Sequence, residues 1–373
     1  MVTEIRVKSP ADFHVHLRQN EMCSLVTPLV REGGFKLAYV MPNLKPPITT
    51  TDMALKYRSE LERIDPQTEF LMTLYLSPEL TPDEIRKAAG VGIVGVKSYP
   101  RGVTTNSDGG IESYETYYPV FEAMQNVGMV LNLHGEIPSD HSTNTCVLNA
   151  EAKFLPHLKL LHEHFPRLKI VLEHATTRAA VEAVKSLGPT VGCSITAHHL
   201  ALVVDDWAGQ AFHFCKPVAK YPDDREALRE VIRDGMFNRS RRLNAIVNNV
   251  PIYYLYNAGH PRFFLGSDSA PHPASAKSTS TPLDGCAAGV FTSPILLPLT
   301  AHLLESFGAL DQLEAFVSTN GRTFYCLPPS VFETNDVLLR KTVEKVVDMR
   351  FVLGDQVAIP FMAGKRINWE IAG

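Results

Sequence analysis

Short apolar runs rich in β-branched residues alternate with longer amphipathic stretches along most of the chain. We interpret eight of these runs as strands, at residues 11–17, 37–41, 70–76, 92–98, 129–134, 169–174, 190–196 and 262–267. The helices expected between them include residues 53–63, 82–89, 113–126, 148–164, 177–186 and 223–234. This alternation predicts repeated βα units around a parallel sheet.

The number of strands decides between two α/β architectures. Eight strands, each followed by a crossover, predict a TIM (β/α)8 barrel, whereas a doubly wound open sheet usually has fewer strands and a glycine-rich turn after the first. No such turn follows residues 11–17. We therefore predict a single domain over residues 1–373, with the barrel at about 10–326 and a short C-terminal extension at about 327–373.

Two less regular segments complete the predicted organisation. Residues 351–357, in the extension, are expected to form a short strand. The stretch 271–282 is rich in Ser, Thr and Pro, and we interpret it as a loop rather than a linker between domains.

Composition narrows the class of protein. The formal net charge of −4 gives no electrostatic reason to expect a nucleic-acid or membrane partner, and the short basic cluster Arg239, Arg241 and Arg242 is interpreted as a solvated helix end. No apolar run approaches the length of a membrane span, and no apolar stretch follows a basic N-terminus. The six cysteines contain no C-x-x-C pair, which favours free thiols. We therefore expect a cytoplasmic protein.

Titratable side chains gather where the expected strands end, which is the catalytic rim of a barrel. They are His14, His16, Lys97, His134, His174 and Asp268. The strand period of two points His14 and His16 to the same face, so both can bind one metal ion. Taken alone, this H-x-H pair fits a half-buried strand equally well, and a single histidine such as His134 is more often a hydrogen-bonded structural residue. Their joint occurrence favours a metal centre.

Lys97 is the most diagnostic of these residues. It closes the apolar run 92–98 and would place a cation at a barrel mouth that already holds imidazoles and metal charge. Burial lowers the pKa of a lysine and frees its amine, so that carboxylation by carbon dioxide would convert it into an anionic ligand. The alternative is an ordinary lysine paired with a nearby carboxylate.

The ordered set H-x-H, Lys, His, His and Asp on eight expected strands resembles the amidohydrolase superfamily. Within it, the chain resembles the dihydroorotases of the short, single-domain type, in register over roughly residues 10–326. The stretches that carry this resemblance are residues 12–18, 41–43, 97–100, 104–107, 132–136, 173–174 and 266–272.

The resemblance implies a site with two zinc ions. His14, His16 and Asp268 would hold one ion, His134 and His174 the other, and N6-carboxylated Lys97 and a hydroxide would bridge them. Asp268 would also take the hydroxide proton and return it to the departing ring nitrogen. The implied reaction is the reversible cyclisation of N-carbamoyl-L-aspartate to L-dihydroorotate in de novo pyrimidine biosynthesis.

The resemblance also implies a substrate-binding set. Arg18, Asn43 and His272 would bind the substrate α-carboxylate, a role that suits the planar guanidinium of arginine. Thr104 and Thr105 would lie on a loop that closes over the substrate, and Lys216 and Ala288 would contact it through backbone atoms. Simpler alternatives are a surface ion pair for Arg18, a turn residue for Asn43 and an inert surface loop at 104–105. We predict a small-molecule substrate and a homodimer.

Two rival functions stay open. A hydantoinase or allantoinase would share the metal ligands but lack the carboxylate-binding set, and a catalytically silent scaffold would have lost metal ligands, none of which is missing here. The pair His198 and His199 is interpreted as structural, because adjacent strand residues point to opposite faces and could not easily share one metal ion.

Overall fold

The structure is a computed structural model that describes residues 2–233, 259–278, 285–327 and 336–372. The arginine cluster at 239–242 lies outside the described residues. The same holds for residue 234 at the end of the last predicted helix, for residues 279–282 of the predicted loop and for residues 328–335 of the extension.

The eight predicted strands form one parallel sheet in chain order, and each is confirmed with small shifts at its ends. They are β2 (Ala11–Val15), β3 (Leu37–Val40), β4 (Glu69–Tyr75), β5 (Gly95–Ser98), β6 (Val130–His134), β7 (Lys169–Glu173), β8 (Val191–Ile195) and β9 (Phe263–Leu265). The sheet closes where Asp268 N donates to His14 O (2.9 Å) and His16 N donates to Ser269 O (3.0 Å). The predicted TIM barrel is confirmed.

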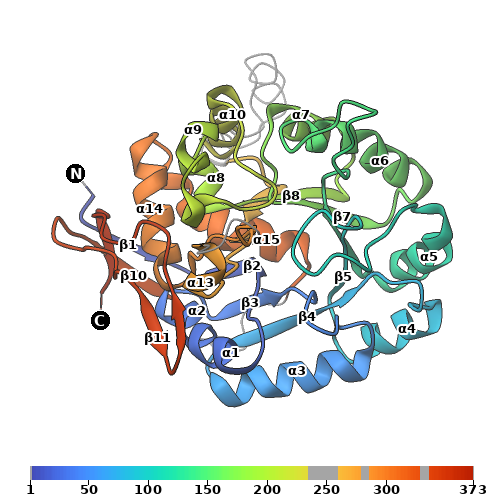
Figure 1. The fold of residues 1–373 in the computed structure, drawn as a ribbon, viewed down its shortest axis with the longest axis horizontal. Helices are drawn as coiled ribbons and strands as arrows, with labels where there is room; N and C mark the ends of the chain where they lie inside the picture. Colours follow the sequence, from blue (N-terminus) through green and yellow to red (C-terminus); the bar gives the residue numbers. More distant parts are fainter. Residues whose placement is uncertain (1, 234–258, 279–284, 328–335, 373) are drawn as a thin grey trace, which may run out of the picture.

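Helices surround the barrel (Figure 1). The predicted ones are α3 (Thr51–Ile64), α4 (Pro82–Gly90), α5 (Tyr118–Val127), preceded by a 3-10 turn at Glu115–Tyr117, α6 (Ala150–His164), α7 (Arg178–Ser186) and α10 (Pro222–Arg233). Several begin at a threonine whose side chain accepts a hydrogen bond from the first turn, as Thr50 does from Met53 N and Thr177 does from Ala180 N. The apolar helix α14 (Leu296–Ser306) and the short helices α1 (Asn20–Val26), α2 (Pro28–Glu32) and α8 (Ala197–Ala201) were not predicted.

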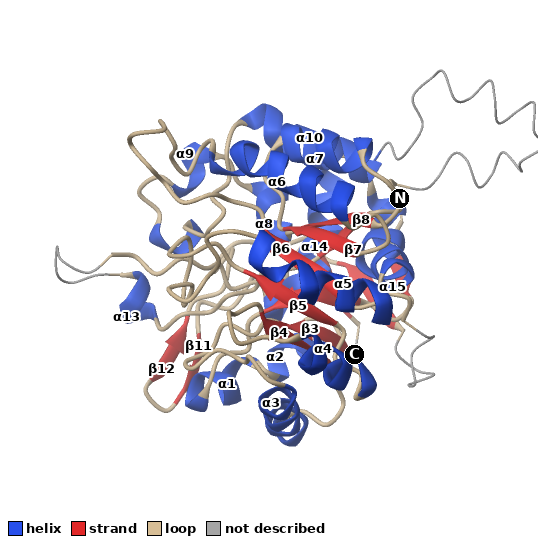
Figure 2. Ribbon diagram, turned by 90° about the vertical axis from the view of Figure 1, so that its right-hand side faces the viewer, coloured by secondary structure: helices blue, strands red, loops and turns tan. Residues whose placement is uncertain are grey.

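Loops gather on one side of the barrel, where α9 (Val204–Trp207) and α13 (Ala274–Lys277) lie (Figure 2). This is the end at which the parallel strands finish, and in TIM barrels it carries the functional loops. Beneath it, a polar layer connects a buried aromatic cluster to the barrel mouth: Tyr39 donates to the Asn132 side-chain oxygen (2.8 Å), and Asn132 Nδ2 donates to Tyr325 (2.7 Å).

The first and last strands of the chain both pair with β10 (Val337–Lys341), which the sequence did not predict. β1 (Glu4–Val7) and β13 (Trp369–Ile371) flank β10 in an antiparallel sheet beside the barrel. Residues 351–357 form a hairpin of β11 (Phe351–Leu353) and β12 (Gln356–Ala358) rather than one strand, because Gly354 turns the chain with φ +56°. Among the described residues, no helix combines the length and apolar character that crossing a membrane requires.

Candidate metal and substrate site

All six rim residues meet at the mouth of the barrel. His14, Lys97 and His134 lie on β2, β5 and β6, while His16, His174 and Asp268 directly or closely follow β2, β7 and β9. Each of these side chains is buried. His174 and Asp268 have left-handed backbone conformations (φ +43° and +44°), and such conformations cluster at functional sites because the surrounding structure must stabilise them.

Three of these residues present their ligand atoms at metal-binding distances. His14 Nε2 lies 3.3 Å from both His16 Nε2 and Asp268 Oδ1, and His16 Nε2 lies 3.1 Å from Asp268 Oδ1. Nitrogen and oxygen ligands placed about 2.0–2.1 Å from a tetrahedral zinc ion lie about 3.3 Å apart. The spacing of these three side chains therefore fits one zinc ion.

The rings of His134 and His174, the second predicted pair of nitrogen ligands, lie side by side at the mouth. Their ring centroids are 4.7 Å apart. Within the described part of the chain, the buried His174 Nδ1 has no hydrogen-bond partner. His134 Nε2 lies 2.9 Å from the Glu136 carboxylate. A carboxylate on the far side of a ligand histidine is the usual way in which proteins orient it.

Lys97 faces the site and contacts the Glu173 carboxylate. Burial lowers the pKa of Lys97, and Glu173 opposes that shift. Glu173 also lies 3.1 Å from His14 Nδ1 and accepts a hydrogen bond from Asn132 Nδ2 (3.0 Å). The structure thus contains the ordinary ion pair that the sequence left open as the alternative for Lys97. Glu173 was not predicted as a site residue, although it directly precedes the predicted ligand His174.

Charge at the mouth is balanced by carboxylates. Burial would lower the pKa of His14, but Glu173 and Asp268 raise it to about 9. Burial lowers the pKa of His16 to about 4. Although burial alone would raise the pKa of Asp268, its hydrogen bonds with His14 and His16 hold it well below the usual range. Asp268 is therefore ionised and available as a ligand at neutral pH.

The predicted substrate-binding residues surround the same pocket. Besides five of the rim residues, the pocket is lined by Arg18, Asn43, Thr104, Thr105, Lys216 and Ala288. Lys97 is fully buried and is not part of this lining. His272 is not part of it, but its Nε2 lies 3.1 Å from Arg18 Nη2 and 3.0 Å from the Ala288 carbonyl. Burial, reinforced by Arg18, lowers the pKa of His272 to about 3, so that this ring is neutral.

The segment that carries Thr104 and Thr105 lies across the mouth. Asn43 Nδ2 donates to Thr105 O (3.0 Å), and Asn106 Nδ2 donates to Asn43 O (2.8 Å). Tyr99, which the sequence analysis did not single out, also lines the pocket, and Lys97 Nζ lies 4.7 Å from its ring centroid. Its position two residues after Lys97, beyond a strand end, was the available signal.

A roomier cavity of about 410 Å³ lies elsewhere, between α5, α6 and the loop that follows β5. Its lining includes Arg101, Tyr114, His157 and Leu161 but none of the six rim residues. Size alone would favour this cavity, whereas the convergent ligand atoms place the candidate chemistry at the barrel mouth.

Known proteins are similar to this chain over nearly its whole length. A family model described as Amidohydrolase matches residues 48–186. The dihydroorotase of Mycosarcoma maydis is 53% identical to this chain, and the match covers 99% of both. The chain belongs to the dihydroorotase family. A probable dihydroorotase of Schizosaccharomyces pombe is 47% identical over 98% of both chains. A crystal structure of dihydroorotase from Saccharomyces cerevisiae, in complex with 5-fluoroorotic acid, has a TM-score of 0.87 and 42% identity, covering 100% of this chain and 99% of that one.

Membership of the dihydroorotase family confirms the predicted enzyme class. The chain is a metal-dependent hydrolase that acts on a cyclic amide, and it carries the TIM barrel of the amidohydrolases. His14, His16 and Asp268 form a candidate metal-binding group within that barrel.

Proposed function

We propose that this dihydroorotase-family chain interconverts N-carbamoyl-L-aspartate and L-dihydroorotate at the barrel mouth, as a step of de novo pyrimidine biosynthesis. The observation that carries the proposal is the tetrahedral spacing of His14, His16 and Asp268 beside a pocket that also contains Arg18. The relatives named dihydroorotase support the choice of substrate.

Two zinc ions suit the ligands present. His14, His16 and Asp268 would hold one, and His134 and His174 would hold the other. Among the described residues, the buried His174 Nδ1 has no hydrogen-bond partner, which supports this assignment, since buried polar atoms normally have one.

Lys97 would bridge the two ions after carboxylation. The neutral amine forms a carbon–nitrogen bond with carbon dioxide and releases a proton, which yields a carbamate that keeps one N–H. Glu173, which already contacts Lys97 Nζ, would accept a hydrogen bond from that N–H. Burial supports the reaction because it favours the neutral amine that carbon dioxide requires.

Asp268 would move the proton during turnover. When bound, the ions supply a water of lowered pKa and polarise the ring carbonyl. Asp268 Oδ1 lies near both His14 and His16, so its second oxygen is the one available to the reacting groups. In hydrolysis, this carboxylate takes a proton and returns it to the departing ring nitrogen, and in cyclisation the order is reversed.

Arg18, Asn43 and His272 would bind the substrate carboxylate. Arg18 is held by its Nε, which donates to Pro271 O (2.7 Å), and its Nη2 faces His272. The buried Asn43 Oδ1 has no partner among the described residues, and Asn43 lines the pocket. Thr104 and Thr105 would close the pocket as a lid, with Lys216 and Ala288 contributing backbone contacts.

The deciding experiment compares substrates with and without metal. Purified protein is assayed with dihydroorotate, hydantoin and allantoin, before and after chelation and after readdition of zinc. Of the three compounds, we expect only dihydroorotate to be turned over. This activity should disappear when the metal is removed and return when zinc is added back. Preferred turnover of hydantoin or allantoin would show that the chain is a hydantoinase or an allantoinase instead.

Three further expectations stay predictions. They are the single-domain organisation, the homodimer and the cytoplasmic location.

A further inference from the structure

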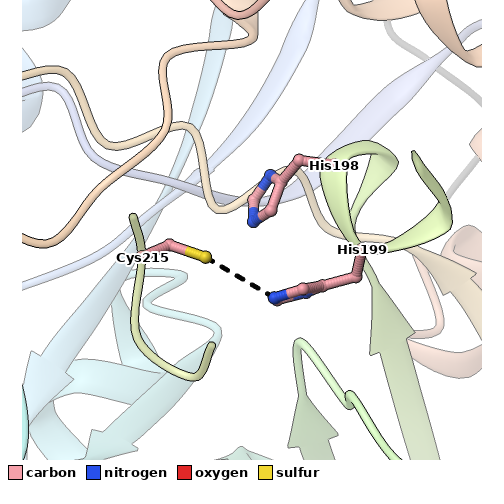
Figure 3. A group of neighbouring side chains, drawn as sticks. All are labelled: His198, His199 and Cys215. Atoms are coloured by element: carbon pink, nitrogen blue, oxygen red, sulfur yellow. Dashed lines mark hydrogen bonds between the residues drawn. The ribbon is translucent and has the colours of Figure 1, made fainter. Parts of the chain in front are cut away.

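A second group of metal-ligating side chains lies outside the pocket described above. His198 and His199 come from α8, and Cys215 comes from the segment that follows a short 3-10 turn at Ala211–His213. All three side chains are buried, and their ligand atoms lie within 4.8 Å of one another. Figure 3 shows both rings directed toward the thiol, with Cys215 Sγ 3.6 Å from His199 Nε2.

The backbone at this histidine pair differs from the extended conformation that was predicted. His198 and His199 lie in a helix rather than a strand, and successive helical residues are about 100° apart instead of on opposite faces. Their ring centroids are 4.5 Å apart, so that both rings reach the same small volume. The inference that the two side chains point to opposite faces was wrong because it assumed an extended backbone, whereas Ala197–Ala201 is helical.

Within the part of the chain that the structure describes, hydrogen bonds satisfy the polar atoms of His199 and Cys215 but not those of His198. His199 Nδ1 lies 2.9 Å from Thr196 Oγ1, which orients the ring, and His199 Nε2 lies 3.0 Å from Pro217 O. Cys215 Sγ donates to the same carbonyl (3.2 Å). His198 is fully buried, yet neither of its ring nitrogens has a hydrogen-bond partner among the described residues. A buried imidazole without a partner needs an explanation, and a bound ion is one of the standard ones.

We propose that His198, His199 and Cys215 bind one zinc ion, at a site separate from the one at the barrel mouth. A tetrahedral ion about 2.3 Å from sulfur and 2.0–2.1 Å from nitrogen holds these two atoms about 3.6 Å apart, which matches the distance between Cys215 Sγ and His199 Nε2. On binding, the thiol releases its proton to solvent and the His199 hydrogen moves to Nδ1, where Thr196 Oγ1 accepts it. The fourth position is available to a water or to Pro217 O.

The position of the site indicates a structural role. The ion would tie the segment containing Cys215 to α8, and the next residue in that segment, Lys216, lines the barrel-mouth pocket. Zinc at this position would therefore hold one wall of the pocket in place.

Cobalt substitution distinguishes the two sites. Thiolate ligands give Co²⁺ a charge-transfer band in the near ultraviolet, whereas the barrel-mouth ligands are nitrogen and oxygen atoms that give none. We expect Co²⁺-loaded protein to show this band and Cys215→Ser to lose it, together with one bound metal ion per chain. Cys286→Ser removes a partly buried thiol outside the cluster and should keep both the band and the metal content. A wild-type protein without the band, or an unchanged band in Cys215→Ser, would overturn the proposal.

Two further measurements keep the test decisive. His198→Asn should weaken binding of this ion by roughly 10–100-fold in a competition titration with a chelator, and unchanged affinity would contradict the role of His198. If Cys215→Ser does not fold, X-ray absorption of the zinc-loaded wild-type protein replaces it. The spectrum averages over all bound ions, and we expect it to contain the contribution of one sulfur ligand per chain. A spectrum with nitrogen and oxygen ligands only would rule the site out.

Discussion

Glu173 Oε1 lies 3.1 Å from His14 Nδ1, on the opposite side of the imidazole from the nitrogen that faces Asp268. The same carboxylate contacts Lys97. Glu173 and His174 are consecutive, and residues in a regular strand would point to opposite faces. The left-handed backbone at His174 allows both side chains to face the site.

Glu173→Gln tests this positioning role. We expect roughly 10–100-fold weaker metal binding, because glutamine keeps the shape but removes the charge that orients His14 and pairs with Lys97. The measurement is a metal-competition titration on folded protein. Glu305→Gln, which changes a carboxylate paired with Lys341 away from the mouth, serves as the control. Equal metal affinity in both variants would assign Glu173 a purely structural role.

Asp268→Asn separates metal binding from proton transfer. The amide oxygen can still act as a ligand, whereas it cannot accept a proton at neutral pH, so we expect retained metal and a kcat lower by about 10²–10⁴-fold. His14→Ala should lose metal and activity together. Metal analysis and steady-state kinetics on the two proteins check both results, and near-normal kcat in Asp268→Asn would exclude the proton-transfer role.

Arg18→Lys tests recognition of the substrate carboxylate. Replacing the planar fork of donors by a point charge should raise KM by roughly 10–100-fold with a smaller effect on kcat. Kinetics with dihydroorotate provide the measurement, and the metal content should not change. A KM equal to that of the wild-type protein would contradict the assignment.

His260 predicts a pH dependence of stability away from the site. Burial lowers its pKa from 6.5 to about 4, so between these values the unfolded chain binds a proton that the folded chain does not. Its contribution to stability is complete above pH 6.5 and is lost as pH falls toward 4. Relative to His260→Gln, the free energy of unfolding of the wild-type protein should fall by up to about 3 kcal/mol over this window.

Denaturant unfolding from pH 7 to pH 4 measures this difference. His141→Gln, which replaces an exposed histidine, is the control and should follow the wild-type curve. If His260→Gln also follows that curve, burial does not disfavour the charged form of His260, and the lowered pKa is contradicted.

The sequence predicted the features that depend on a short-range pattern. Alternating apolar and amphipathic stretches revealed all eight barrel strands, and side chains such as His134 could be located because they close an apolar run. In a parallel barrel, all strands end at the same mouth, so residues at the ends of different strands can be predicted to lie close together.

Features that depend on local backbone geometry or distant pairing escaped prediction. The pair His198 and His199 was placed in an extended segment because the five-residue helix α8 is too short to show a helical period, although Thr196 caps its first turn. β1 is only four residues long, and Leu339, which pairs with Ile5, lies more than 300 residues away in the chain. No periodicity encodes such a contact.

The three-stranded sheet at the chain ends has a consequence for truncation. β10 is its central strand and hydrogen-bonds β1 on one side and β13 on the other. Deleting the first seven residues would strip one side of β10 and expose a row of unsatisfied amides and carbonyls. Such a bare edge invites strand addition from a neighbouring molecule, so we expect a shortened protein of this kind to self-associate while its distant barrel mouth stays intact.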